Sequence, residues 1–518
     1  MNALGRQPHN TPGGTVRLVD TSTRDGNQSL WGAAGLTTGM VEALGPYLER
    51  AGLVAIDFTS STHLSVGVRW HHEDPWERIS RMRAVTPGTP LSLITTGMRF
   101  MSWDRSPQSV MRLSMRMLAE SGLRRIQIAE PMNDTAQASA IARLAKEEGI
   151  EQVVAAVTFT ESPVHDDALY ATAAKHLAAE PDIDVVYLKD PGGLLTPDRT
   201  RALVPQLLAA VGDRPLELHS HCTTGLAPEV YVIAAQLGIN VLHTAVGALS
   251  NGTSQPSAVR LVHNLAAVGI DTEVDLDALR EAERIVDVIA SSQGLEPGRP
   301  TELDLAYQQH QVPGGMMGTL RRQLSEIGQL DLLPAVLEEV GSVRAALGYP
   351  IMVTPYSQFV GSQAVMNVLA ARSGQDRWSR MPDEVLRYLL GHFGEAPGPV
   401  DQEVAARAAD NPRTRELDKS QPEPELADLR RGVQEKTGRS DVADAEVLLR
   451  TVLPAEQVDA IVAPAPAWDP DGTTGPGAAT TAAEFVREVV RLPHWRELDV
   501  RLGDERVQLR RGDDGGER

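Results

Sequence analysis

The chain of 518 residues contains one cysteine, Cys222, and only five lysines beside 44 arginines. A single cysteine excludes an intramolecular disulfide, and we therefore expect a protein of the reducing cytoplasm. No run approaches the ~20 apolar residues that a membrane helix requires, so direct membrane insertion is not expected. Residues 1–14 are polar and lack the apolar core of a signal peptide, and we expect them to be disordered.

The charge balance is acidic. The formal net charge is −20, and no long basic run interrupts it. Because this charge repels a polyanion, nucleic acid is not an expected partner. A composition of 42% hydrophobic and 23% charged residues is ordinary for a globular protein, and the length is sufficient for two or three domains.

Eight short apolar segments alternate with helix-period stretches in residues 15–268. The predicted strands are Val16–Asp20, Leu53–Phe58, Leu91–Thr95, Ile126–Ile128, Val153–Val157, Val185–Leu188, Leu216–Leu218 and Val241–Val246. This alternation predicts a TIM (β/α)8 barrel of the α/β class. A doubly wound open sheet is the main alternative, which the lack of a Gly-rich dinucleotide loop after the first strand weakens only slightly.

The remainder of the chain divides into three parts. Residues 269–462 have mostly helical periodicity, and we predict a C-terminal α-helical domain that covers the barrel mouth. Residues 463–482, rich in Ala, Pro, Thr and Gly, predict a flexible linker. Residues 483–518 predict a helix over Phe485–Val490 and a hairpin whose strands alternate through Leu498–Leu502 and Val507–Leu509.

His219-Ser220-His221 ends the seventh predicted strand. Residues i and i+2 of a strand project to the same side, so both imidazoles can meet one metal ion, although ordinary hydrogen bonds are the alternative. Asp25 follows the first strand and offers a hard anionic ligand, the alternative being a turn or N-cap residue. In a barrel these strand ends meet at the carboxyl-terminal face, where barrel active sites lie.

Two further residues bear on the chemistry. Lys189 ends the sixth strand, but an ammonium group has no lone pair and ligates only when deprotonated or converted by CO2 to a carbamate. A salt bridge to Asp190 is the alternative for Lys189. Thr354 offers a hydroxyl able to carry a proton, although Thr-Pro by itself usually indicates a turn.

Taken together, these segments resemble the carboxyltransferase component of biotin-dependent enzymes. That family includes the pyruvate carboxylase carboxyltransferase domain, the oxaloacetate decarboxylase alpha subunit and the matching transcarboxylase subunit, and the resemblance covers roughly residues 15–405. The matching motifs are Asp20–Asp25 with Gln28-Ser29, Glu73–Arg78, Lys189-Asp190, His219-x-His221, Thr253–Pro256, Pro313–Gly315, Val353–Pro355 and Val360–Val365.

The resemblance implies a divalent metal, commonly zinc, manganese or cobalt. Carried over by position, the metal ligands would be Asp25, carbamylated Lys189, His219 and His221. Arg24 and Gln28 would orient the substrate. Thr354 would pass a proton between biotin and the substrate carbon. The implied reaction moves a carboxyl group between carboxybiotin and an enolisable acceptor similar to pyruvate or oxaloacetate.

The resemblance also implies partners. No Met-Lys-Met biotin attachment sequence surrounds any lysine, so biotin would be supplied in trans by a biotin carboxyl carrier protein, together with a biotin carboxylase subunit. A homodimer within a larger complex is expected. The tail, 483–518, resembles the segment that precedes the biotinyl domain of carrier proteins, and we predict that it docks such a carrier.

The acceptor side departs from the family pattern. The family's Arg-Gly-x-Asn-x-x-Gly-Tyr segment is here Thr96–Trp103, which lacks both polar anchors, and Thr96, Arg99 and Trp103 are the residues expected to contact the acceptor. The family's Asp after the second strand is replaced by Ser65. The sequence therefore predicts that the metal-binding residues match the family pattern and that the acceptor-binding residues differ from it.

Two other functions fit parts of the pattern. A metal-dependent lyase or condensing enzyme of the hydroxymethylglutaryl-CoA lyase or isopropylmalate synthase type shares a similar Arg-Asp-Gly opening and an H-x-H. Lys189 and Thr354 favour carboxyl transfer, since those lyases lack both motifs. A non-catalytic assembly subunit is the third alternative, and bound metal would discriminate against it.

Overall fold

The computed structural model describes residues 10–101, 105–418, 423–469, 497–502 and 505–510. The chain divides into two compact units, residues 1–464 and 465–518, and the boundary lies within the predicted linker. Among the described residues, no helix combines the length and the apolar character that crossing a membrane requires.

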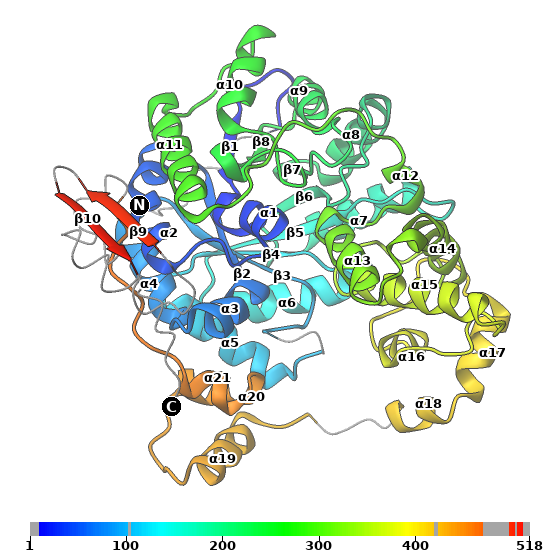
Figure 1. Ribbon diagram of the computed structural model, residues 1–518. Coiled ribbons are helices and arrows are strands. Elements are labelled where there is room, and N and C mark those ends of the chain that lie inside the picture. The colour runs from blue at the N-terminus through cyan, green and yellow to red at the C-terminus, as the bar shows by residue number, and fades with distance from the viewer. Residues whose placement is uncertain (1–9, 102–104, 419–422, 470–496, 503–504, 511–518) are drawn as a thin grey trace. The chain divides into compact units, whose positions relative to one another are not determined.

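Eight parallel strands close into a barrel in the first unit, as the sequence predicts (Figure 1). The strands are β1 (Arg17–Asp20), β2 (Ala55–Ser60), β3 (Leu91–Thr95), β4 (Arg125–Ile128), β5 (Gln152–Thr158), β6 (Val185–Asp190), β7 (Leu216–Ser220) and β8 (Val241–Thr244). β1 pairs with β8 from Arg17 opposite Val241 to Asp20 opposite Thr244. This closure excludes the open-sheet alternative.

Helices surround the strands, and nearly all strand residues are therefore buried, the polar ones included. Every residue of β5 is buried, as expected for a parallel strand covered on both faces. The connecting helices are α2 (Thr38–Arg50), α4 (Pro75–Val85), α5 (Gln108–Glu120), α6 (Thr135–Glu147), α7 (Asp167–Ala179), α8 (Pro197–Val211), α9 (Ala227–Leu237) and α10 (Ala258–Ala267). Several start at side-chain N-caps, such as Asp166 before α7 and Thr196 before α8.

Short elements follow the first two strands and the last strand at the carboxyl end of the barrel. A π-helical turn, η1 (Ser22–Gly26), and α1 (Asn27–Trp31) follow β1; α3 (Ser61–Val66) and η2 (Gly67–His71) follow β2; and η3 (Gly247–Leu249) follows β8. They hold the ends of these strands in fixed conformations, so the side chains at this end project from ordered backbone.

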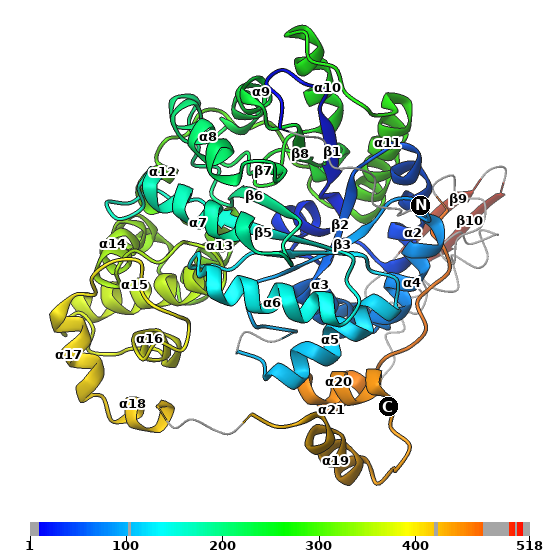
Figure 2. The same ribbon diagram turned by 180° about the vertical axis from the view of Figure 1, so that it is seen from behind.

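The chain after the barrel is helical. Its elements are α11 (Leu276–Gln293), α12 (Tyr307–His310), α13 (Gly314–Glu326), η4 (Leu330–Leu332), α14 (Leu333–Ala346), α15 (Tyr356–Arg372), α16 (Asp383–Leu389), α17 (Gln402–Asp410), α18 (Pro412–Leu417), α19 (Leu426–Thr437), α20 (Asp444–Val452) and α21 (Ala455–Asp459). A second apolar core forms here, with Val336 and Val340 of α14 and Phe359 and Val360 of α15. The two views show α12 to α17 gathered on one side of the barrel (Figures 1 and 2).

Polar contacts attach this helical region to the carboxyl end of the barrel. Arg344 of α14 donates to Thr160 Oγ1 at 2.8 Å and to the Glu161 carbonyl at 3.0 Å, both in the loop after β5. Gln311 donates to the same Glu161 carbonyl at 2.7 Å, and α13 contacts α1. The division at residue 268 and the covering role of the helical region remain predictions.

The two ends of the described chain are also structured. Asn10 donates its amide to the Arg214 carbonyl at 2.8 Å and accepts the Leu216 N–H at 2.9 Å, so ordered contacts begin before residue 15. In the second unit β9 (Glu497–Leu502) and β10 (Glu505–Arg510) form the predicted antiparallel hairpin. The predicted helix over Phe485–Val490 and residues 1–9 and 511–518 lie outside the described residues.

Charged residues are buried inside the barrel near the amino-terminal ends of its strands. Arg125 of β4 donates to Glu217 of β7 at 2.5 Å, and both side chains are wholly buried. Arg125 also donates to Gln152 of β5 at 3.0 Å. A charge enclosed in this way depends on its partner, because no water can replace the partner.

We predict that Arg125→Met lowers the free energy of unfolding by about 3–5 kcal/mol, because it leaves the Glu217 carboxylate buried without its counter-charge. Urea unfolding followed by circular dichroism measures the change. The matched control is Arg280→Met, which removes an exposed pair with Asp277 and is expected to change stability by less than about 0.5 kcal/mol. Equal effects of the two variants would contradict the prediction.

Candidate active site and metal centre

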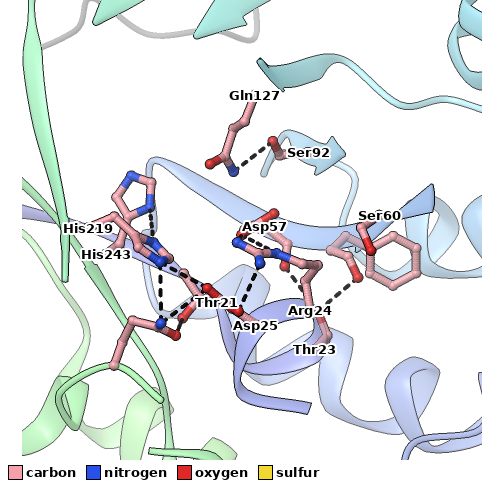
Figure 3. Close-up of polar contacts among 12 residues, drawn as sticks. Thr21, Thr23, Arg24, Asp25, Asp57, Ser60, Ser92, Gln127, His219 and His243 are labelled. Carbon is pink, nitrogen blue, oxygen red and sulfur yellow. Dashed lines mark hydrogen bonds and ion pairs between the residues drawn. The ribbon is translucent and has the colours of Figure 1, made fainter. Parts of the chain in front are cut away.

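Asp25, His219 and His221 converge at the carboxyl end of the barrel. Asp25 lies in η1 directly after β1, His219 lies in β7, and His221 follows β7. Asp25 Oδ2 lies 2.9 Å from His219 Nε2 (Figure 3). It also lies 3.2 Å from His221 Nε2, and the two Nε2 atoms are 3.3 Å apart. The predicted meeting of these three side chains therefore occurs, and all three are buried.

Hydrogen bonds on the far side of each imidazole fix which nitrogen carries the hydrogen. His221 Nδ1 lies 2.6 Å from the Thr253 carbonyl, which can only accept, so Nδ1 is the donor. His243 Nε2 donates to the Glu217 carboxylate at 2.8 Å, and its Nδ1 then accepts from His219 Nδ1 at 3.2 Å. In the neutral rings Nε2 of both His219 and His221 is consequently left with a bare lone pair.

This donor set fits a divalent metal ion. Two imidazole lone pairs and one carboxylate oxygen face each other at about 3 Å with no hydrogen between the two nitrogens, an arrangement that a cation stabilises. Metal-bound histidines usually donate their other N–H to a carbonyl or a carboxylate. Here His221 donates to the Thr253 carbonyl, and His219 donates to His243, which in turn donates to the Glu217 carboxylate. Nitrogen and oxygen ligands of this kind suit zinc, manganese or cobalt.

Arg24 lies between two carboxylates. Its Nη1 is 2.9 Å from Asp25 Oδ1, and its Nε donates to Asp57 Oδ2 of β2 at 2.8 Å, with Nη2 also bonded to that oxygen (Figure 3). Burial acts to raise the pKa of Asp25, but the Arg24 guanidinium beside it outweighs burial and holds this pKa well below its usual range. Asp25 is thus a carboxylate at neutral pH, with Oδ2 directed at the histidines.

Lys189 of β6 is buried beside this cluster. Its Nζ lies over the Tyr187 ring, 5.9 Å from the centroid. Burial lowers the pKa of Lys189 to about 8, against the opposing effect of Asp25. Asp190, the predicted alternative partner, instead accepts hydrogen bonds from the N–H groups of Leu194 and Leu195 and from the Ser220 hydroxyl.

The residues expected to contact the acceptor lie at the ends of β1 and β3. Gln28 is half-buried on α1, and Thr96 is half-buried after β3, with its carbonyl accepting from Arg99 Nη1 at 2.7 Å. Trp103 lies outside the described residues. The Arg99 guanidinium is buried over the ring of Phe393, 5.1 Å from the centroid, so Arg99 joins the β3 loop to the helical region.

Thr354 is half-buried immediately before α15, at a cis bond to Pro355. Tyr356, two residues further on, is buried beside Phe393 and donates to the Phe393 carbonyl at 3.3 Å. The Thr354 segment and Arg99 therefore meet around the same aromatic residue.

Sequence reasoning missed four residues that build this site: Asp57, Glu217, His243 and Gln255. Glu217 precedes His219 by two positions in the same strand, so the strand period would have placed it on the same side. Gln255 lies within the Thr253–Pro256 motif, to which the sequence attached no role. Asp57 and His243 gave no local signal, because their partners are distant in sequence.

Known proteins resemble this chain over most of its length. A "Conserved carboxylase domain" model matches residues 308–465, and an "HMGL-like" model matches residues 114–286. A pyruvate carboxylase subunit of Methanocaldococcus jannaschii is 33% identical over 76% of this chain and 68% of its own length. The chain belongs to this pyruvate carboxylase subunit family.

Other relatives have different names. The 2-oxoglutarate carboxylase large subunit of Hydrogenobacter thermophilus is 28% identical over 86% of the chain and 68% of its own length. The methylmalonyl-CoA carboxyltransferase 5S subunit of Propionibacterium freudenreichii is 27% identical over 76% of both chains. The carboxyl transferase domain of Rhizobium etli pyruvate carboxylase, at 24% identity, shares the fold with a TM-score of 0.79 over 95% of this chain and 83% of that one.

We predict that His221→Ala lowers divalent metal affinity more than about 100-fold, since even residues that only orient ligands cost up to that factor. Chelator competition with cobalt or zinc measures the affinity. His263→Ala, an exposed histidine of α10, is the control and should bind metal as the unaltered protein does. Unchanged metal binding by His221→Ala would contradict the assignment.

Proposed function

We propose that this family member is the carboxyltransferase subunit of a multi-subunit biotin-dependent enzyme, moving a carboxyl group between biotin on a separate carrier and an enolisable acceptor. The observation that carries the proposal is the convergence of Asp25, His219 and His221, with bare lone pairs, in a chain of this family. A bound divalent ion would supply a Lewis acid that stabilises the acceptor's enolate oxygen.

Arg24 and Gln28 orient the acceptor in this proposal. Arg24 is fixed by Asp25 and Asp57, so its positive charge is preorganised beside the metal ligands. A fixed cation stabilises charge that develops on an enolate without having to reorganise during the reaction.

Lys189 serves as a further metal ligand once it is a carbamate. The neutral amine attacks the carbon of CO2, a C–N bond forms, and one N–H proton leaves to water, which yields a carboxylate on the lysine. The amine is buried near Asp25, and Asp190 is occupied by other donors, which supports this role.

Thr354 moves a proton. Its hydroxyl oxygen takes a proton from the acceptor carbon while its own hydrogen passes to biotin, so no charge remains on the side chain in a dry site. The N–C bond of carboxybiotin breaks and releases CO2, and the electron pair left on biotin takes the Thr354 hydrogen. The acceptor carbon, now an enolate, attacks this CO2 and forms the new C–C bond. The reverse sequence decarboxylates the product.

We infer a 2-oxo acid similar to pyruvate or oxaloacetate as the acceptor, bound with help from Thr96, Arg99 and Trp103. Because one relative is named for 2-oxoglutarate, this longer acceptor belongs in the same test. The inferred partners are a biotin carboxyl carrier protein and a biotin carboxylase subunit, with a homodimer of this chain in the cytoplasm.

A metal-dependent lyase or condensing enzyme is the second candidate. The "HMGL-like" match over residues 114–286 and the Asp–His–His cluster favour it. Lys189 and Thr354 support carboxyl transfer instead, and dependence on biotin separates the two candidates.

We predict that the metal-loaded protein releases pyruvate from oxaloacetate and that free biotin stimulates the release. Thr354→Ala should lower the biotin-stimulated rate by about 10²–10⁴-fold because the proton carrier is lost, whereas Thr354→Ser should retain most of it. Lys189→Ala should also abolish the stimulation. A coupled lactate dehydrogenase assay measures pyruvate.

Release of pyruvate that is independent of biotin, or a Thr354→Ala variant as active as the unaltered protein, would contradict the assigned roles. If the metal-loaded protein acts on neither oxaloacetate nor the carboxylation product of 2-oxoglutarate, the 2-oxo acid assignment is wrong.

We also propose that residues 483–518 dock the carrier. A chain ending at residue 463, just before the boundary between the two compact units, should lose carrier binding but keep its metal content. Surface plasmon resonance with the biotinylated carrier measures carrier binding, and elemental analysis measures the metal content. Normal carrier binding by the shortened chain would overturn this role.

A further inference from the structure

Gln255 reaches the metal-ligand cluster from the segment that follows β8. Its side chain is wholly buried, and its amide nitrogen, as placed, lies 3.2 Å from Asp25 Oδ2, 3.3 Å from His219 Nε2 and 3.1 Å from His221 Nε2. No other role in the site has been assigned to Gln255. Its contact with all three atoms at once needs an explanation.

The four atoms form a nearly regular tetrahedron. Three edges join the Gln255 amide atom to the other three atoms, and the remaining edges, among Asp25, His219 and His221, are 2.9, 3.2 and 3.3 Å. The centre of a tetrahedron with edges of this length is about 2 Å from every corner, which is the distance of zinc from nitrogen and oxygen ligands. The arrangement thus has the size of a four-coordinate metal site.

The orientation of the amide decides whether Gln255 can ligate. Oxygen and nitrogen of a side-chain amide are assigned from their hydrogen bonds, so the opposite orientation has to be tested against the neighbours. As placed, the oxygen lies 2.8 Å from the Thr21 hydroxyl, which also lies 2.9 Å from the Thr244 carbonyl. A hydroxyl has one hydrogen, and it cannot donate to both oxygens.

Exchanging the two amide atoms resolves this conflict. The NH2 group then donates to Thr21 Oγ1 and to Ser254 Oγ, which lies 3.3 Å away, and the Thr21 hydrogen goes to the Thr244 carbonyl. The amide oxygen now faces the cluster and adds a fourth lone-pair atom. Four such atoms repel each other unless a cation lies between them.

We propose that the Gln255 amide oxygen is a metal ligand that completes a tetrahedral site with Asp25, His219 and His221. The inference rests on the metal of the proposed function. It further implies that the protein holds its ion before Lys189 becomes a carbamate, which then adds a ligand rather than completing the site.

Metal binding in CO2-free buffer, without biotin or acceptor, tests the inference. Cobalt affinity by chelator competition and the visible absorption of the cobalt protein are measured for the unaltered chain, Gln255→Ala and Gln255→Glu. We expect Gln255→Ala to lose at least about 10-fold in affinity and to change the cobalt spectrum. Gln255→Glu keeps an oxygen ligand and should bind at least as tightly as the unaltered protein.

Gln363→Ala is the matched control, because Gln363 is an equally buried glutamine of the helical region. It should leave affinity and spectrum unchanged. If Gln255→Ala binds cobalt normally with an unchanged spectrum, or if Gln255→Glu loses the ion as Gln255→Ala does, Gln255 is not a ligand.

Circular dichroism identifies any variant that fails to fold, and the spectrum of Gln255→Glu then decides alone: an unchanged spectrum overturns the inference, and a shifted one supports it. If the unaltered protein binds no divalent ion even with bicarbonate, the metal of the proposed function falls as well. Normal metal binding by Gln255→Ala removes only the present inference.

Discussion

The pairing of the first strand with the last is the constraint on which the site depends. β1 and β8 are joined in register from Arg17 opposite Val241 to Asp20 opposite Thr244. Asp25 leaves one of these strands and Gln255 follows the other, although 230 residues separate them in sequence. β7, the neighbour of β8, adds His219 and His221. Without closure of the sheet, these side chains would lie at opposite edges.

Within the closed barrel, hydrogen bonds determine what each ligand presents. A series of side-chain contacts runs along the barrel interior from His219 through His243 and Glu217 to Arg125. All four side chains are buried. Glu217 therefore serves two purposes, since it balances the charge of Arg125 and fixes the hydrogen on His243. The same buried residues that pair inside the barrel therefore also orient His219.

The proposed acceptor side is built differently, from contacts between the barrel and the helical region. Arg99 of the β3 loop stacks on Phe393, and Arg344 and Gln311 bond to the loop after β5. Loops of this kind vary without disturbing the strands that position Asp25, His219 and His221. Relatives named for pyruvate and for 2-oxoglutarate fit this separation.

The sequence by itself determined the fold class and the convergence of Asp25 with His219 and His221. Apolar runs located all eight strands, because a parallel strand buried on both faces has a distinctive composition, and the two-residue period put His219 and His221 on one side. Only the tertiary structure decided which nitrogen of each histidine faces the cluster and that Gln255 reaches it. Hydrogen-bond direction depends on partners from distant strands, and local patterns specify the face of a side chain but not its partner.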